Sequence, residues 1–524
     1  MIRFIGRLVA VTLLTLSASS WAMSAGRLTI NIPKISAMTD IGKQGSCQSS
    51  GYVSRNPGPV IPYVGKTRLL SSQLIGAASV TNVTRAQQKL YAPFAGIGFL
   101  PGSATLPTFT PPTDSSKLYR ITYSSDDQTL SGLVVVPDNS IANGLVVYTH
   151  ATQASQQKGA ASNPSNEACT VTSILAGKGR LLAMPDYIGY GVNSGSHPYA
   201  LGTINAQSGI DIILAAKELA AIVNTANAVG TRLAITGYSE GGGNAFWLAR
   251  KIATANPPLD LMGSQLTMIA PMSGPYDMMG AMVPSMLTAQ PGVLTQPSLN
   301  QAVTYLIRPL LVAFAAQGAS DYAPSPGSPL STLLKSPFLN FVQSSPLPFQ
   351  TGSLTYLRGL IRSATATGYT LVSPNPANVM QPDFVTALIA NDSSFPAVVL
   401  WQSNDNVDWV PKVGSTSVPT YVAGILQDEI VPFAGSSYPL PEGYTGGSPM
   451  FAKGNSENLI RSLREIGSSD NVAWVGLDAK TISVKGIGKL RLNHLIGFPA
   501  VFTLAAKAIE TGSIAGLPTI PDPN

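Results

Sequence analysis

The stretch of sequence that decides the fold reads Arg232-Leu233-Ala234-Ile235-Thr236-Gly237-Tyr238-Ser239-Glu240-Gly241. Residues 232–236 predict a short buried strand, and the sequence from Asn244 onward predicts a helix. Residues 237–241 therefore occupy a sharp turn from strand to helix. We expect Ser239 to adopt a strained backbone there, while Gly237 and Gly241 let strand and helix approach without side-chain clashes.

Short apolar runs alternate with longer helical patterns along the rest of the chain. The further strand-like runs are 145–148, 180–184, 266–270 and 420–426, and the helical periods cover 205–223 and 245–252. Two β-rich runs around a polar turn at 118–136 predict an antiparallel hairpin. The alternation predicts an α/β protein with a mainly parallel sheet flanked by crossover helices.

The length of the chain suits either one large domain with an elaborate insertion or two domains. The chain has 524 residues, of which 11% are charged and 44% are apolar. We predict a core of residues 116–276 and 391–515, an N-terminal extension of residues 23–115, and a helical cap or lid insertion of residues 277–390. The insertion is apolar and sparsely charged, which suits either a cap over a water-poor pocket or an ordinary segment packed on the core.

The first 22 residues are typical of a signal peptide. Arg3 and Arg7 precede an apolar stretch at 8–16, and Ser20-Trp21-Ala22 is a small-x-small cleavage site. The apolar stretch is about half the roughly 20 residues that a spanning helix needs. We therefore expect a secreted or periplasmic protein whose mature chain begins at Met23.

The two cysteines, Cys47 and Cys169, both follow the predicted cleavage site. An even cysteine count in an exported chain favours a disulfide over metal binding, with two free thiols as the alternative. The formal net charge is +6, without clusters of Lys and Arg. Nucleic-acid binding is therefore not expected.

A serine at its ordinary pKa needs a base to become a nucleophile, and histidine is the usual one. The chain contains His150, His197 and His494. Where a serine lies in this kind of strand-turn-helix, the acid and then the histidine follow it in the sequence. Only His494 lies after Ser239, so we predict His494 as the general base.

Several acids lie between Ser239 and His494. Asp428 follows the strand-like run at 420–426, and a loop at the carboxyl end of a sheet strand is where the orienting acid is found. We predict Asp428 for this role. Asp405 and Asp408 are the alternatives, although their sequence is more typical of residues that cap or order a loop.

A tetrahedral intermediate needs backbone N–H donors. One predicted donor is the N–H of Glu240, directly after the serine; the other is the N–H of His150, with Ala151 and Thr152 as alternatives, in the turn after the run at 145–148. We expect the His150 side chain itself to be structural. The segments 186–191 and 197–199 either border the pocket or are simple turns.

The motifs together resemble those of the secretory lipase family of α/β-hydrolases. They are Thr149-His150-Ala151-Thr152, Pro185-Asp186-Tyr187-Ile188-Gly189-Tyr190-Gly191, Gly237-Tyr238-Ser239-Glu240-Gly241-Gly242, Gln427-Asp428-Glu429-Ile430-Val431-Pro432 and Asn493-His494. The resemblance implies an α/β-hydrolase fold, an export signal, a helical cap, and triacylglycerols or simpler esters as substrates. It also implies a triad of Ser239, Asp428 and His494, with His150 and Glu240 at the oxyanion hole. A carboxylate at position 240 and residues 1–100 depart from the family pattern.

The expected function is hydrolysis of carboxylic esters through an acyl-enzyme, without a metal or an organic cofactor. The expected partner is a small-molecule or lipid ester, with transient contact at a lipid interface. A peptidase of the same fold and a non-catalytic exported lipid-binding module are the alternatives. Acyl chain length, alcohol preference and oligomeric state are left open.

Overall fold

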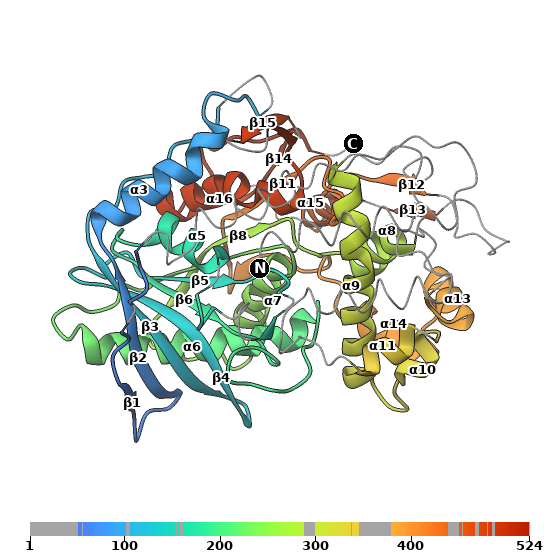
Figure 1. The fold of residues 1–524 in the computed structure, drawn as a ribbon, viewed down its shortest axis with the longest axis horizontal. Coiled ribbons are helices and arrows are strands. Elements are labelled where there is room, and N and C mark those ends of the chain that lie inside the picture. The colour runs from blue at the N-terminus through green and yellow to red at the C-terminus, as the bar shows by residue number, and fades with distance from the viewer. Residues whose placement is uncertain are drawn as a thin grey trace.

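The computed structural model contains one large sheet with helices on both of its faces (Figure 1). The described residues are 51–54, 56–100, 105–153, 155–156, 161–164, 166–287, 299–336, 338–344, 379–438, 450–452, 454–466, 471–478, 480–484 and 488–522. The predicted signal peptide, residues 1–22, lies outside this described part of the chain.

Within the described residues the sheet has 10 strands in the order β1-β2-β3-β4-β6-β5-β7-β8-β11-β14. Their bounds are β1 Val60–Pro62, β2 Leu69–Ala78, β3 Ser116–Ser125, β4 Gln128–Pro137, β5 Leu145–Thr149, β6 Leu181–Pro185, β7 Arg232–Tyr238, β8 Gln265–Met272, β11 Thr420–Ile425 and β14 Val472–Leu477. The pairings from β1 to β6 are antiparallel. Those from β6 to β14 are parallel, which confirms the mainly parallel sheet predicted from the sequence.

The parallel strands are buried on both faces, which explains why their sequences are almost continuously apolar. Every residue of β5, β6, β11 and β14 is buried. Side chains alternate between the two faces: Val146 and Tyr148 belong to one hydrophobic cluster, whereas Leu145 and Val147 belong to the other. The first cluster includes residues of helices α3 Val80–Tyr91, α5 Asn166–Leu175 and α16 His494–Thr511; the second includes residues of α6 Gly202–Val223, α7 Glu240–Thr254 and α15 Asn455–Glu465.

Three strands of this sheet were not predicted from the sequence. β1 and β2 come from the stretch predicted only as an N-terminal extension, and they extend the antiparallel edge of the sheet beside β3. β14 forms the opposite edge. β2 has no clean alternation of apolar and polar residues, so its sequence carries no clear strand signal.

Helices inserted between β8 and β11 form a separate hydrophobic cluster, on the right in Figure 1. Their bounds are η3 Met278–Met282, α8 Val283–Leu287, α9 Leu299–Tyr322, α10 Leu330–Leu333, α11 Phe338–Ser344, α13 Pro382–Ala390 and α14 Pro396–Gln402. The cluster includes Phe314 of α9, Phe384 of α13 and Trp401 of α14. The apolar packing of this inserted region, which we call the predicted cap, therefore continues beyond residue 390, the predicted end of the insertion.

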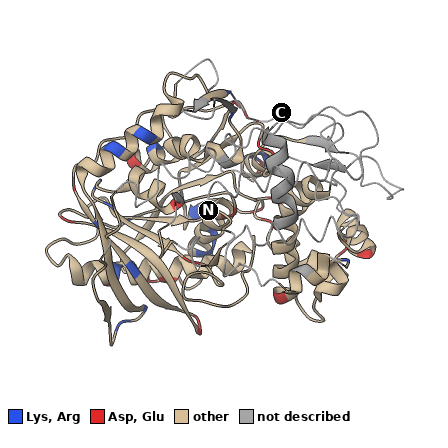
Figure 2. Cartoon of the chain, in the orientation of Figure 1, with Lys and Arg blue, Asp and Glu red and all other residues tan. Residues whose placement is uncertain are grey.

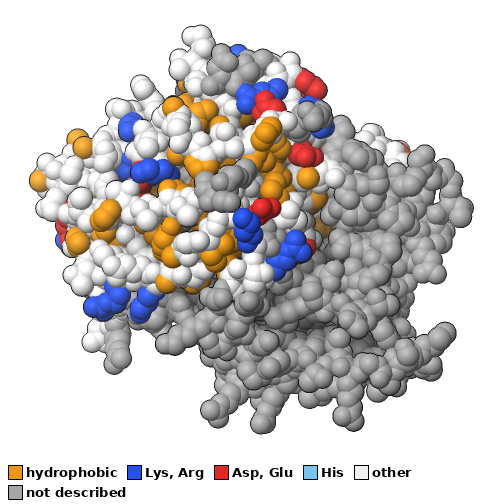
Figure 3. All heavy atoms as spheres, turned by 90° about the horizontal axis from the view of Figure 1, so that it is seen from above, with side chains coloured by type: hydrophobic (Ala, Val, Ile, Leu, Met, Phe, Trp, Pro, Cys, Tyr) orange, Lys and Arg blue, Asp and Glu red, His pale blue; other side chains and the backbone are white. Residues whose placement is uncertain are grey.

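The charged residues are spread over many elements of the α/β part, as the sequence suggests (Figure 2). Seen from above, hydrophobic side chains lie between groups of Lys, Arg, Asp and Glu (Figure 3). None of the helices in the described part of the chain is both long and apolar enough to span a membrane.

Candidate active site

Ser239 lies between β7 and α7 with a strained backbone, at φ 56° and ψ −126°. The flanking glycines have no room for a side chain. A Cβ on Gly237 would lie 2.3 Å from the carbonyl oxygen of Gly241, and one on Gly241 would lie 2.0 Å from that of Thr149. This close approach of strand, turn and helix explains the pattern of glycines around the serine and places Ser239 at the carboxyl edge of the parallel sheet.

Three residues distant in the sequence form a chain of hydrogen bonds. The Nε2 atom of His494 lies 2.8 Å from the Oγ of Ser239, and its Nδ1 lies 2.7 Å from Oδ2 of Asp428. His494 and Asp428 are 3% and 8% exposed, so water competes little for these contacts. The structure thus brings together the three residues predicted from motif order, in the arrangement that lets a histidine accept a serine proton.

Asp428 is held from the side opposite His494. It follows the end of β11 at Ile425, and its Oδ1 accepts hydrogen bonds from the N–H groups of Ile430 at 3.0 Å and Val431 at 2.8 Å. These two donors fix the carboxylate and leave Oδ2 for the imidazole. The turn Asp428-Glu429-Ile430-Val431 therefore orients the acid by its own backbone.

The two alternative acids lie elsewhere. Asp405 accepts from the N–H groups of Met278 and Met279 at 2.6 and 3.0 Å and so orders the start of the inserted helices. Burial raises the pKa of Asp405 to about 7. Asp408 forms an ion pair with Arg250. Both carboxylates have the loop-ordering contacts that their sequence suggested.

A second carboxyl group, that of Glu429, lies beside the His494–Asp428 pair and was not singled out from the sequence. Its Oε2 accepts from the backbone N–H of His494 at 3.2 Å. Burial, together with the charge of Asp428, raises the pKa of Glu429 to about 7. Burial opposes protonation of His494, but the charges of Asp428 and Glu429 outweigh it and raise the pKa of this histidine. The position of Glu429 next to Asp428 was the only signal for it in the sequence.

The turn after β5 packs directly against the start of α7. Thr149 donates its hydroxyl to the carbonyl oxygen of Gly241 at 2.6 Å, and a Cβ on Gly241 would lie 2.6 Å from the carbonyl oxygen of His150. The two predicted oxyanion positions, His150 and Glu240, are therefore each next to a residue of this contact between Thr149 and Gly241. As the first residue of α7, Glu240 has an N–H that a helix leaves without an intrahelical acceptor.

The His150 side chain is buried away from the triad contacts. Its Nδ1 donates to the carbonyl oxygen of Ala151 at 2.8 Å, and its ring stacks on Tyr187 with centroids 4.2 Å apart. Burial lowers the pKa of His150 to about 4, so the ring is neutral near pH 7. These contacts fit the structural role expected for the side chain.

Side chains whose contacts the sequence did not predict hold this turn in place. Glu167 of α5 accepts from the N–H of Ala151 at 2.8 Å and from the hydroxyl of Tyr148 at 2.6 Å. Tyr187 donates its hydroxyl to the carbonyl oxygen of His150 at 2.9 Å. The carboxyl group and the two tyrosines lie on separate segments, so no local motif links them.

The segment 186–191 is anchored by Asp186. This carboxyl group accepts from the N–H of Ala161 and from the hydroxyl of Ser131, both at 2.6 Å. Burial raises the pKa of Asp186 to about 6. The segment therefore positions Tyr187 against the turn after β5, where the Tyr187 hydroxyl binds the carbonyl oxygen of His150.

Two other sequence-based predictions concern cysteines and metals. Cys169 is fully buried in α5, whereas Cys47 lies outside the described residues, so the disulfide between them stays a prediction. Among the residues that the structure describes, no group of three or more His, Cys, Asp or Glu side chains could hold a metal ion.

Neither a protein-family model nor a curated protein sequence matches the chain. Its structure is similar to a Legionella pneumophila protein proposed to be a hydrolase, at 21% identity and a TM-score of 0.60 over 86% of this chain and 99% of that one. It is also similar to LipA, a rice cell wall degrading esterase from Xanthomonas oryzae, at 19% identity and a TM-score of 0.54 over 86% and 97% of the two chains. These likenesses concern the fold. The chain has the α/β-hydrolase fold, as predicted from the sequence.

Proposed function

We propose that this protein is a serine hydrolase that cleaves carboxylic esters, with Ser239 as nucleophile, His494 as general base and Asp428 as the acid that orients the base. The observation that carries the proposal is the continuous hydrogen-bond chain from Ser239 through His494 to Asp428, starting at a strained serine between β7 and α7. The similarity in fold to an esterase and to a protein proposed to be a hydrolase supports it.

In the proposed cycle His494 takes the proton of Ser239 as Oγ attacks the ester carbonyl. The carbonyl oxygen becomes an oxyanion, which the N–H groups of Glu240 and His150 stabilise. His494 then donates its proton to the leaving alcohol, and the acyl group stays on Ser239. Water, deprotonated by the same histidine, attacks this acyl-enzyme and releases the acid.

Esters with apolar acyl groups are the proposed substrates. The cap cluster is built from Leu, Val, Ala, Phe, Met and Trp side chains, and a peptidase pocket would need a charge for the substrate amine or carboxylate. A comparison of p-nitrophenyl esters from acetyl to long-chain acyl groups, below and above the micelle limit, tests this choice. A preference for long chains with a jump at the interface would support a lipase; faster turnover of peptide amides would contradict the proposal.

The direct test of the nucleophile is Ser239→Ala. We expect this variant to fold normally and to lose hydrolysis of a short p-nitrophenyl ester by about a thousandfold or more, because no other residue replaces the nucleophile. Covalent labelling by a fluorophosphonate should disappear in the same variant. Retained turnover or retained labelling at wild-type rates would reject Ser239 as the nucleophile.

We also propose that the protein is exported and cleaved after Ala22. The proposal rests on the basic, apolar and small-residue segments at the N-terminus. N-terminal sequencing of the protein from the periplasm or medium of an expressing bacterium should begin at Met23. A full-length chain retained in the cytoplasm would contradict it.

A further inference from the structure

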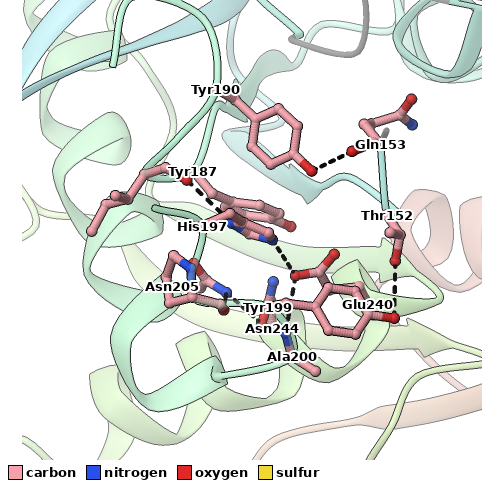
Figure 4. A network of polar contacts seen from close by, with 12 residues as sticks. Thr152, Gln153, Tyr187, Tyr190, His197, Tyr199, Ala200, Asn205, Glu240 and Asn244 are labelled. Carbon is pink, nitrogen blue, oxygen red and sulfur yellow. Dashed lines mark hydrogen bonds and ion pairs between the residues drawn. The ribbon is translucent and has the colours of Figure 1, made fainter. Parts of the chain in front are cut away.

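The side chain of Glu240 is buried and bound, although it directly follows the candidate nucleophile. Its Oε1 accepts from Nε2 of His197 at 2.7 Å and from the backbone N–H of Ala200 at 3.1 Å (Figure 4). Glu240 and His197 are 3% and 1% exposed. A carboxylate buried this far is stable only when it is paired and hydrogen-bonded, so the contact constrains both partners.

His197 is fixed from several directions. Its Nδ1 lies 3.1 Å from the carbonyl oxygen of Ile188. Its ring stacks on Tyr187, with centroids 5.6 Å and planes 10° apart, and meets the edge of Tyr190 at 4.9 Å. The imidazole therefore has little freedom to follow Glu240 if that side chain moves.

The segment that carries His197 is also held by cap helix α9. Tyr322 donates its hydroxyl to the carbonyl oxygen of Ser196 at 2.6 Å, and the ring of Phe314 lies 5.3 Å from that of Tyr199. Ala200 has a φ of 55°, a left-handed conformation that is unfavourable for alanine. Its N–H bond to Glu240 helps to stabilise this backbone, so side chain 240 and segment 196–200 hold each other in place.

We infer that the His197–Glu240 pair is a positioning device for the oxyanion hole. Because the side chain and N–H of Glu240 belong to one residue, anchoring the carboxylate restrains the position of the backbone that carries the N–H. The same aromatic cluster reaches the other predicted donor, since Tyr187 binds the carbonyl oxygen of His150. This inference rests on the proposed function, and it assigns Glu240 a second role beyond its N–H.

The test uses variants that keep the N–H of residue 240 and change only its anchor. Glu240→Ala removes the anchor, and Glu240→Gln keeps an oxygen that can accept from Ala200 while it removes the carboxylate. His197→Gln removes the imidazole but keeps a side-chain donor. Glu218→Gln is a matched control: Glu218 is a buried carboxylate that accepts from three backbone N–H groups, at residues 67–69, on another part of the fold.

We expect Glu240→Ala to lower kcat about 10- to 100-fold with KM within about twofold, because the anchored N–H stabilises the transition state rather than the substrate. The kcat of Glu240→Gln should lie between those of the wild type and Glu240→Ala. His197→Gln combined with Glu240→Ala should cost little more than Glu240→Ala alone, since the two residues act as one unit. Glu218→Gln should lower thermal stability and leave kcat unchanged.

A trifluoromethyl ketone separates positioning from general damage, because its adduct with Ser239 carries an oxyanion and the matching methyl ketone binds without one. The inhibition constant of the trifluoromethyl ketone should rise by the same factor as kcat falls, while that of the methyl ketone stays constant. Wild-type kcat in folded Glu240→Ala, or lost kcat with unchanged affinity for the trifluoromethyl ketone, would overturn the inference. If Glu240→Ala does not fold, Glu240→Gln and His197→Gln carry the same test. Activity retained in Ser239→Ala would instead reject the proposed function.

Discussion

Tyr238 stacks on the imidazole of His494, with ring centroids 5.0 Å and planes 30° apart, and donates its hydroxyl to the backbone carbonyl oxygen of the same histidine. Tyr238 is the last residue of β7 and directly precedes Ser239, and His494 is the first residue of α16. One side chain therefore ties the strand that carries the candidate nucleophile to the helix that begins with the candidate base.

Tyr238→Phe should keep the stacking and lose the hydrogen bond. We expect kcat to fall by up to about tenfold with little change in KM, because one buried hydrogen bond contributes about 0.5–1.5 kcal/mol. Steady-state kinetics with a short p-nitrophenyl ester provide the measurement. Tyr421→Phe is the control, since Tyr421 donates to the carbonyl oxygen of Pro518 and should affect stability alone. Equal kinetic losses in both variants would argue against a specific role for Tyr238.

Asp428→Asn should lower kcat by about 10⁴-fold while the fold is retained. An amide that keeps its oxygen on the N–H groups of Ile430 and Val431 presents its NH₂ to His494, which favours the wrong imidazole tautomer. Asp408→Asn, at an exposed ion pair with Arg250, should stay within about twofold of wild type. An Asp428→Asn enzyme as active as the control would show that another group orients the base.

Glu429 should influence the pH dependence of the reaction. His494 must be neutral to accept a proton, and its raised pKa places the acidic limb of kcat/KM above the ordinary histidine value of 6.5. Glu429→Gln removes a negative charge that favours the imidazolium ion, so the limb should move to lower pH. A pH–rate profile measures it, with Asp408→Asn as the reference variant. An unmoved limb, or one that moves to higher pH, would exclude this electrostatic contribution.

Gly241→Ala should lower the free energy of unfolding by about 1–3 kcal/mol, as overpacking typically does. The added Cβ would lie 2.0 Å from the carbonyl oxygen of Thr149, which is backbone and cannot rotate away. Urea denaturation followed by circular dichroism gives the value. Gly58→Ala, whose nearest neighbour would be at 3.5 Å, is the control and should be close to neutral. Similar values for the two variants would contradict the close approach at the turn.

The predicted disulfide between Cys47 and Cys169 has a simple chemical test. The purified protein, unfolded without reductant, should show no reactive thiol, and two after reduction. Under the chain-entropy model, reduction should lower the free energy of unfolding by roughly 4–5 kcal/mol, less any native-state strain. Two reactive thiols before reduction would establish the alternative of free cysteines.

Much of the core was predictable because strands buried on both faces leave long apolar runs in the sequence. β5, β6, β7, β8 and β11 were all expected within a few residues of their bounds. β2 was not, because its buried residues recur at every third position and not at every second one, which is the period of a strand. β14 is fully buried, but it was not predicted. Its six residues come directly after a polar stretch, and no motif of a catalytic loop marks the end of the strand.

The sequence by itself selected Ser239, Asp428 and His494 as the candidate triad. It contains only one histidine after Ser239, and Asp428 follows a predicted strand. Only the tertiary structure decided which other polar side chains surround them. Glu429, Glu167 and His197 lie on separate segments, and burial and pairing of a charge depend on which segments the fold brings together. The same reason applies to Glu240. The sequence predicted a role for its N–H, whereas the contact of its side chain with His197 depends on the packing of two distant turns.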